Sequence, residues 1–169
     1  MSDTHFLRPL RLPSGIAGTL WLGPMPGRLR PFGDDMDDLR AQKITRIVCL
    51  TPPAEIEAKA PGYAAALGGG MDVPVVRFPI ADFGVPGDEA GLFALAGETA
   101  RAISAGDRVF VHCAAGIGRT GTFAICILRA FGHDLAEATA LVASAGSGPE
   151  TEAQKALAAR FALPAEINP

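Results

Sequence analysis

Residues 107–121 combine a cysteine, an arginine and several glycines in a pattern that could bind and attack an anion. The run Val-Phe-Val-His-Cys is typical of a buried strand, and the glycine-rich turn after it leads into a helical pattern. In such a unit, consecutive backbone N–H groups and the positive end of the helix dipole point at one place, which makes an anion site. Cys113 opens this loop and Arg119 closes it.

Together, Cys113 and Arg119 favour in-line displacement at phosphorus. The loop amides, the helix dipole and the guanidinium all stabilise a thiolate at Cys113. The planar fork of Arg119 can hold two oxygens of a tetrahedral anion while the sulfur faces the central atom. Because these groups supply the positive charge, the mechanism needs neither a metal ion nor another cofactor. The three histidines, at positions 5, 112 and 133, are dispersed, so no metal site is expected.

The chain matches in full the signature H-C-x5-R-[ST], at His112, Cys113, Arg119 and Thr120. The sequence therefore resembles the cysteine-dependent protein tyrosine phosphatase superfamily, whose signature is highly specific. Residues 146–154 are similar to a turn and helix start of small dual-specificity phosphatases, especially the branch related to kinase-associated phosphatase. The resemblance extends from about residue 20 to residue 161. An excess of arginine over lysine, 12 to 3, is typical of bacterial proteins encoded by GC-rich DNA.

The resemblance implies a two-step reaction, in which Cys113 takes the phosphoryl group as a phosphocysteine and water then hydrolyses it. In that family an aspartic acid on a separate loop protonates the leaving oxygen. It precedes the cysteine by about thirty residues in small members. Asp82, in the segment 79–86 after an expected strand, lies 31 positions before Cys113 and is the predicted general acid. Asp88 is the second candidate, although a helix N-cap is expected at its position.

The resemblance also assigns supporting residues. The phosphate-binding loop that it implies consists of Ala114, Ala115, Gly116, Ile117, Gly118 and Arg119. His112 is expected to support this loop and the ionisation of the cysteine. Thr120 could donate a hydrogen bond to the sulfur, cap the helix that starts there, or do both. Gln154 contacts the active-site water in one interpretation and is a capping or surface residue in the other.

Two further cysteines are expected in the core, as is usual for free thiols. Cys126 falls in the middle of an apolar helical pattern. Cys49 lies in an apolar strand pattern and has a second interpretation: some relatives place a cysteine on a neighbouring strand, where it traps an oxidised nucleophile as a disulfide.

The same segment contains a competing motif. Residues 116–121 satisfy G-x-G-x-x-G, and Glu137 follows at about the distance of the acidic residue in dinucleotide-binding folds. That residue should end a second strand, whereas Glu137 lies in a helical pattern. Dinucleotide binding is therefore disfavoured.

Short aliphatic runs alternate with helical patterns, which is typical of βα units in an α/β fold. Strands are expected at residues 18–22, 45–50, 73–78 and 107–113. Helices are expected at residues 34–42, 54–66, 88–104, 119–131, 134–145 and 150–161. We therefore expect a compact central sheet of about four to five strands, flanked by helices, with a phosphatase-like strand–loop–helix active site. Residues 1–169 are expected to form one phosphatase domain, in which residues 1–15 are an irregular N-terminal segment.

The composition excludes several classes of protein. With 49% hydrophobic residues and a net charge of −3, the chain suits a globular domain rather than a disordered or collagen-like one. The mildly acidic balance argues against nucleic-acid or membrane partners, which normally require a clustered basic face. Three widely spaced cysteines and the lack of a secretory signal predict a cytoplasmic location. The sequence does not indicate the oligomeric state.

These features predict a phosphoprotein phosphatase of tyrosine or dual specificity, whose partner is a phosphorylated protein or peptide. A chain of 169 residues lacks room for the segments that deepen the pocket of large tyrosine-specific relatives, so a shallow site is expected. Ala114, Ala115 and Ile117 stand where phosphoinositide-directed relatives tend to carry lysines, which disfavours highly anionic lipid head groups. The alternative is a catalytically weak phosphopeptide-binding module that uses the same pocket. The intact set of cysteine, arginine and aspartate argues against it.

Overall fold

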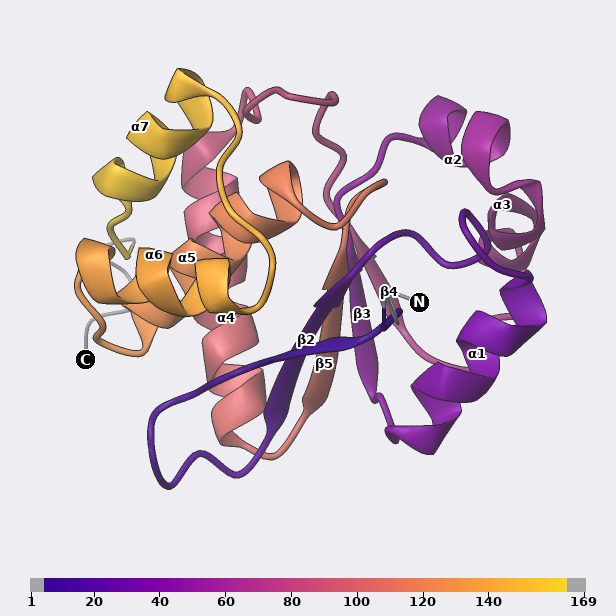
Figure 1. The fold of residues 1–169 in the computed structure, drawn as a ribbon, viewed down its shortest axis with the longest axis horizontal. Coiled ribbons are helices and arrows are strands. Elements are labelled where there is room, and N and C mark those ends of the chain that lie inside the picture. Colours follow the sequence, from indigo (N-terminus) through magenta and orange to yellow (C-terminus); the bar gives the residue numbers. More distant parts are fainter. Residues whose placement is uncertain (1–4, 164–169) are drawn as a thin grey trace.

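A five-stranded sheet forms the centre of the protein in a computed structural model, which describes residues 5–163 (Figure 1). The strands are β1 (Arg8–Leu10), β2 (Thr19–Gly23), β3 (Arg46–Cys49), β4 (Val75–Arg77) and β5 (Arg108–His112). Their order along the sheet is β1-β2-β5-β3-β4. β1 is antiparallel to β2, and the other neighbours are parallel. The predicted α/β class with a sheet of four to five strands is confirmed.

Helices cover both faces of the sheet (Figure 1). One face carries α1 (Phe32–Ala41), α2 (Pro53–Lys59) and α3 (Pro61–Leu67). The other carries α4 (Glu89–Ser104), α5 (Gly118–Ala130), α6 (Leu135–Ser144) and α7 (Glu152–Arg160). Between residues 5 and 163, no helix is both long and apolar enough to cross a membrane.

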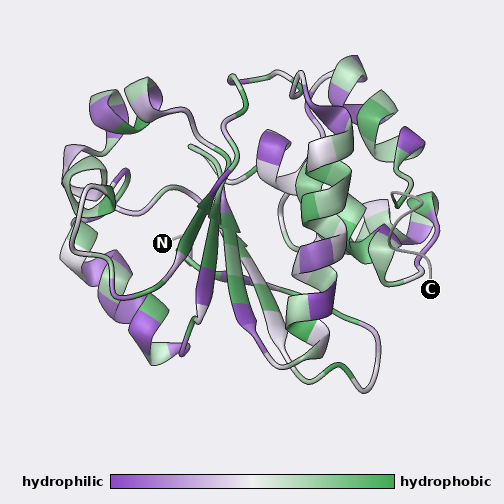
Figure 2. Ribbon diagram, turned by 180° about the vertical axis from the view of Figure 1, so that it is seen from behind, coloured by the Kyte–Doolittle hydropathy of each residue, from purple (hydrophilic) through white to green (hydrophobic). Residues whose placement is uncertain are grey.

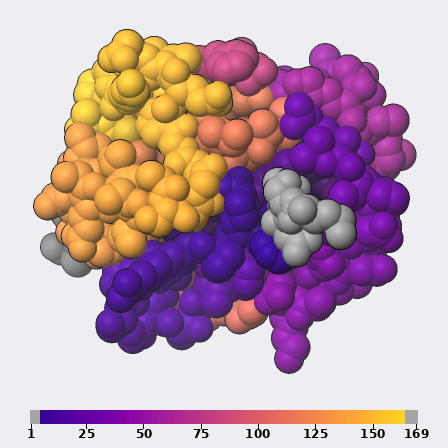
Figure 3. All heavy atoms as spheres, in the orientation of Figure 1, coloured from indigo at the N-terminus to yellow at the C-terminus, as the bar shows by residue number. Residues whose placement is uncertain are grey.

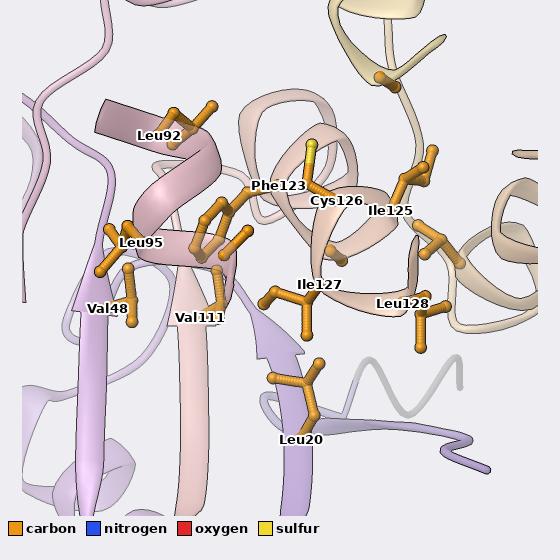
Figure 4. Packing of buried hydrophobic residues seen from close by; sticks show 14 of the residues in the cluster. Leu20, Val48, Leu92, Leu95, Val111, Phe123, Ile125, Cys126, Ile127 and Leu128 are labelled. Atoms are coloured by element: carbon orange, nitrogen blue, oxygen red, sulfur yellow. The ribbon is translucent and has the colours of Figure 1, made fainter. Parts of the chain in front are cut away.

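The central strand β5 and helix α5 form the middle of the core. Four of the five residues of β5 are buried, as expected for a parallel strand covered on both faces. Hydrophobic residues predominate along the strands (Figure 2), and most residues of α5 are buried. Phe123 and Ile127 of α5 pack in one cluster with Val111 and Leu20 of the sheet (Figure 4). Because the core fixes both β5 and α5, the loop that joins them has rigid ends.

The prediction that residues 1–15 are irregular is wrong at residues 8–10, which form β1. Pro9 is tolerated there because β1 lies at the edge of the sheet. The N–H that proline lacks is therefore not needed for hydrogen bonds between central strands. Leu10 is buried and pairs with Leu20 of β2. A strand of three residues carries little local signal, so pairing with β2 decides its conformation.

The single helix predicted at residues 54–66 is also wrong, because the chain forms two helices there. Pro61 lacks an N–H and restricts the residue before it to extended backbone. Ala60 accordingly has φ −149° and ψ 70°, which ends α2 and begins α3. Tyr63 of α3 is thereby buried.

Cys49 and Cys113 face opposite sides of the sheet. In the ladder between β3 and β5, Cys49 pairs with His112. Paired residues share a face, and successive residues alternate between faces. Cys49 therefore packs in a cluster with Tyr63, whereas Cys113 belongs to the cluster around Phe123. All three cysteines of the chain are free thiols in this structure.

We expect mild peroxide to oxidise Cys113 without linking it to Cys49, because such a disulfide would require the backbone to move. Peptide mapping under non-reducing conditions distinguishes sulfenic and sulfinic acid at Cys113 from a cross-link. Burial raises the pKa of Cys126 to about 12, so this thiol stays protonated and does not compete. A Cys49→Ser variant should give the same products as the wild type. A cross-link that disappears in this variant would contradict the prediction.

Candidate active site

Cys113 lies directly after β5, at the carboxyl edge of the sheet, and residues 113–117 connect β5 to α5. Its side chain is almost fully buried. The backbone N–H of Gly116 donates to Sγ at 3.2 Å, and the amino end of α5 follows the loop. Backbone amides and the helix dipole stabilise negative charge at this position.

Two positions around the loop require glycine because the backbone of another segment approaches closely. Gly116 has a φ of +75°, and a Cβ there would lie 2.3 Å from the carbonyl oxygen of Gly23. At Gly121, a Cβ would lie 2.2 Å from the backbone nitrogen of Gly148. The loop can therefore pack against the end of β2 and against the segment before α7 only if both residues lack a side chain.

The guanidinium of Arg119, a residue that is 3% exposed, connects α5 to the segments that follow β3 and β4. It donates to both oxygens of Glu55 at 3.0 and 2.9 Å, to Asp82 Oδ1 at 3.1 Å and to the carbonyl oxygen of Ile80 at 2.8 Å. Burial by itself lowers the pKa of Arg119, but Glu55, the Cys113 thiolate and Asp82 raise it overall. The structure thus brings Cys113, Arg119 and Asp82 to one edge of the sheet.

Sequence reasoning missed Glu55, because an acidic residue after Pro-Pro-Ala reads as a helix-start signal. Its position after β3 is a usable signal, since the carboxyl ends of parallel strands meet at one edge. Partial burial would raise the pKa of Glu55. Hydrogen bonds and charge from Arg119, with help from Lys59, lower it overall. Glu55 is therefore an ionised partner that fixes the plane of the guanidinium.

Asp82 lies on the loop between β4 and α4, and its carboxylate also accepts the N–H of Phe83 at 3.0 Å. Phe83 has a φ of +60°, which is uncommon for an aromatic residue, and its side chain is 57% exposed. Because of this exposure, the ring of Phe83 does not anchor the loop in the core. Asp88 is engaged elsewhere: it caps α4 by accepting the N–H of Gly91 at 2.9 Å.

Gln154 is 1% exposed, so it is not a surface residue. Its Oε1 accepts the N–H of Glu150 at 2.8 Å, and its Nε2 donates to the carbonyl oxygen of Gly84 at 3.2 Å. Thr151 supplies the cap of α7 and accepts the N–H of Gln154. The side chain of Gln154 therefore ties α7 to the loop that carries Asp82.

His112 holds the backbone of Cys113 from the other face of the sheet. Burial raises the pKa of Tyr63, so its phenol stays protonated and donates to Nε2 of His112, at 2.8 Å. Nδ1 then donates to the carbonyl oxygen of Cys113 at 2.9 Å. We assign this tautomer from the two partners, which together satisfy a neutral imidazole.

Thr120 makes neither of the two expected contacts in this structure. It is fully buried, and its Oγ1 has no hydrogen-bond partner within residues 5–163. Ile117 occupies the N-cap position of α5, without a side-chain cap. A buried hydroxyl without a partner beside an anion-binding loop is available to a bound group.

A buried cysteine after a parallel strand and a buried arginine at the start of the next helix, with an aspartate reaching the arginine, define a cysteine-dependent phosphatase type of centre. Residues 25–166 match the family described as PTP-SAK, Swiss Army Knife protein, DSP-PTPase phosphatase domain. The chain therefore belongs to this family of dual-specificity phosphatase domains. No curated protein sequence matches the chain significantly.

Solved structures share the fold at low sequence identity. A kinase-associated phosphatase, with serine in place of the catalytic cysteine, is 20% identical, with a TM-score of 0.80 over 92% of both chains. Tk-PTP in its active form is 22% identical, with a TM-score of 0.64 over 89% of this chain and 92% of the other. The human tyrosine phosphatase-like serine/threonine/tyrosine-interacting protein is also 22% identical, with a TM-score of 0.65 and the same coverage.

We expect Glu55→Gln to lower kcat/KM towards p-nitrophenyl phosphate by about tenfold, because Arg119 loses one of two parallel, charge-assisted hydrogen bonds. Glu57→Gln is the matched control, since Glu57 is exposed on the same helix α2. Equal rates for the two variants would show that Glu55 does not orient Arg119.

The lowered pKa of Glu55 also sets a pH dependence for its effect on stability. A carboxylate with a lowered folded-state pKa stabilises the fold above its unfolded-state pKa and loses this effect as the pH falls through the folded-state value. The difference in Tm between wild type and Glu55→Gln should therefore be present at pH 7 and shrink below about pH 4.

Proposed function

We propose that this phosphatase domain hydrolyses phosphomonoesters on proteins through a phosphocysteine at Cys113. The observation that carries the proposal is the buried guanidinium of Arg119, which lies in the first turn of α5, directly after the loop of Cys113, and contacts Asp82 at 3.1 Å. Nucleophile, anion-binding group and proton donor are thereby within reach of one phosphate.

In the first step, the Cys113 thiolate attacks phosphorus, and the S–P bond forms as the P–O bond to the leaving oxygen breaks. Protonated Asp82 gives its proton to that oxygen. In the second step, water attacks phosphorus, Asp82 takes up its proton and the S–P bond breaks. Arg119 and the amides of residues 114–118 hold the phosphate oxygens in both steps. Because a phosphate dianion competes with Asp82 for Arg119, binding frees the aspartate to face the leaving oxygen.

The rim of the site supports a protein substrate with apolar groups around the phosphorylated residue. Leu29, Phe83, Val85 and Ile117 are the exposed large hydrophobic residues in the described part of the chain. All four lie on loops after the carboxyl ends of β2, β4 and β5. A cavity of about 450 Å³, lined in part by Leu29 and Ile117, adjoins the phosphate-binding loop. Large apolar groups on loops around a site suit a phosphoprotein better than a highly anionic head group.

Free cysteines fit the cytoplasmic location proposed for the protein.

Hydrolysis of p-nitrophenyl phosphate without added metal tests the proposal. We expect activity in the wild type and complete loss in Cys113→Ser, because serine cannot replace the thiolate under these conditions. Reduced, folded wild type that shows no activity but binds phosphopeptides would support the phosphopeptide-binding module instead. Activity that persists in Cys113→Ser would exclude the phosphocysteine.

The free enzyme is productive with Cys113 ionised and Asp82 protonated, so kcat/KM should depend on pH in a bell shape. We expect Asp82→Asn to remove the fall on the alkaline side and to lower kcat by about 100-fold. The loss should be larger with phenyl phosphate, which has the poorer leaving group. Asp88→Asn preserves a good N-cap and should keep the alkaline limb. Loss of that limb in Asp88→Asn alone would transfer the role to Asp88.

A further inference from the structure

Arg8 lies beside the phosphate-binding loop, although more than 100 positions separate them in the sequence. β1 is antiparallel to β2, so Arg8 pairs with Leu22 near the carboxyl edge of the sheet. Its guanidinium donates to the carbonyl oxygen of Gly116 at 2.6 Å, to Ser147 Oγ at 2.9 Å and to the carbonyl oxygen of Ala145. Figure 3 shows the N-terminal residues, in indigo, against the C-terminal helices in orange and yellow.

The contacts of Arg8 orient one peptide of the loop, the peptide between Gly116 and Ile117. The Gly116 carbonyl accepts from Arg8 and from Ser147 Oγ, each at 2.6 Å. In a trans peptide, a carbonyl and the N–H of the next residue point in opposite directions. A Gly116 carbonyl held on the outside of the loop therefore directs the N–H of Ile117 to the inside. The N–H of Gly116 itself already donates to Cys113 Sγ.

Arg8 also brings a positive charge that no carboxylate neutralises among residues 5–163, because its acceptors are all neutral oxygens. Arg119, by contrast, shares its charge with Glu55 and Asp82. Burial lowers the pKa of Arg8, and a negative Cys113 acts in the opposite direction. Since an arginine in a protein stays protonated, this charge persists beside the sulfur.

We propose that Arg8, together with Ser147, is a positioning residue for the phosphatase reaction. It holds the peptide between Gly116 and Ile117 in the orientation that binds phosphate, and its charge favours the Cys113 thiolate. This inference rests on the proposed function, since the loop is taken to bind a phosphate. Arg8 acts through the loop and does not itself contact the reacting atoms.

Other charged or titratable groups lie close to Cys113 or act on it through a neighbour. Arg119 approaches from α5, and His112 lies behind the Cys113 peptide. Glu55 and Asp82 act through Arg119. A test of Arg8 must leave these groups unchanged and must separate its charge from its geometry.

Three variants of Arg8 and Ser147 separate the contribution of charge from that of geometry. Arg8→Met removes both charge and hydrogen bonds, Arg8→Lys keeps the charge but cannot reach three acceptors, and Ser147→Ala removes one neutral donor. Arg108→Met is the matched control. Arg108 is also half-buried and donates to a backbone carbonyl, that of Gln42 at 2.7 Å, but it lies at the opposite end of β5.

Three measurements apply to each variant: inhibition by inorganic phosphate, the pH dependence of iodoacetamide alkylation of Cys113, and the pH dependence of kcat/KM. In Arg8→Met we expect phosphate inhibition to weaken by about tenfold. This change corresponds to the loss of one strong hydrogen bond to phosphate, that of the Ile117 N–H, which is no longer held in place. The acid limb of kcat/KM should move to higher pH, because a lost positive charge disfavours the thiolate. Arg8→Lys and Ser147→Ala should weaken phosphate inhibition and leave the acid limb near that of the wild type.

The proposal would be overturned if Arg8→Met and Arg108→Met showed the same phosphate inhibition and the same acid limb of kcat/KM. If Arg8→Met does not fold, unchanged phosphate inhibition in both Arg8→Lys and Ser147→Ala would overturn it equally. Absence of turnover in the wild type would refute the proposed function alone. In that case, phosphate binding to the loop can still be measured, because bound inorganic phosphate protects Cys113 from alkylation by iodoacetamide. This protection must weaken in Arg8→Met for the role of Arg8 to stand.

Discussion

The carboxyl edge of the sheet depends on one buried cation, the guanidinium of Arg119. A buried charge is costly unless oxygens surround it, so Arg119 requires partners from other segments. Glu55 supplies two oxygens and Asp82 a third, and the Ile80 carbonyl completes the set. The same requirement therefore draws α2, which follows β3, and the loop after β4 onto the start of α5. The plane of the guanidinium is therefore already set in this structure.

Strand topology explains why these partners are within reach. β5 lies between β2 and β3 in parallel orientation, and β4 follows β3. Parallel strands present their carboxyl ends at one edge, so loops distant in sequence meet there. Strand β1 is antiparallel, so its first residue, Arg8, rather than its last residue lies near that edge. The centre thus has an anionic side around Glu55 and Asp82 and a cationic support behind Gly116.

The residues that local patterns revealed are those whose role depends on neighbours in sequence. Cys113 and Arg119 belong to one strand–loop–helix unit, and Asp82 follows a strand at a spacing typical of the family that the sequence resembles. Glu55, Arg8 and the buried contacts of Gln154 escaped prediction. Each has an ordinary local explanation, such as a helix start, a proline-broken terminus or a cap. Their partners lie 64, 108 and 70 positions away, and no local pattern encodes such pairs.

The sequence by itself determined the strand–loop–helix unit, the α/β class and the chemistry that the loop can support, because strand pattern, glycines and helix start are properties of consecutive residues. Only the tertiary structure decided the strand order, the face on which Cys49 lies and the partners of Arg119. It also decided that a short N-terminal strand forms beside β2. These features arise from pairing and burial between distant segments, whose free energy depends on the whole packed sheet rather than on any single stretch of chain.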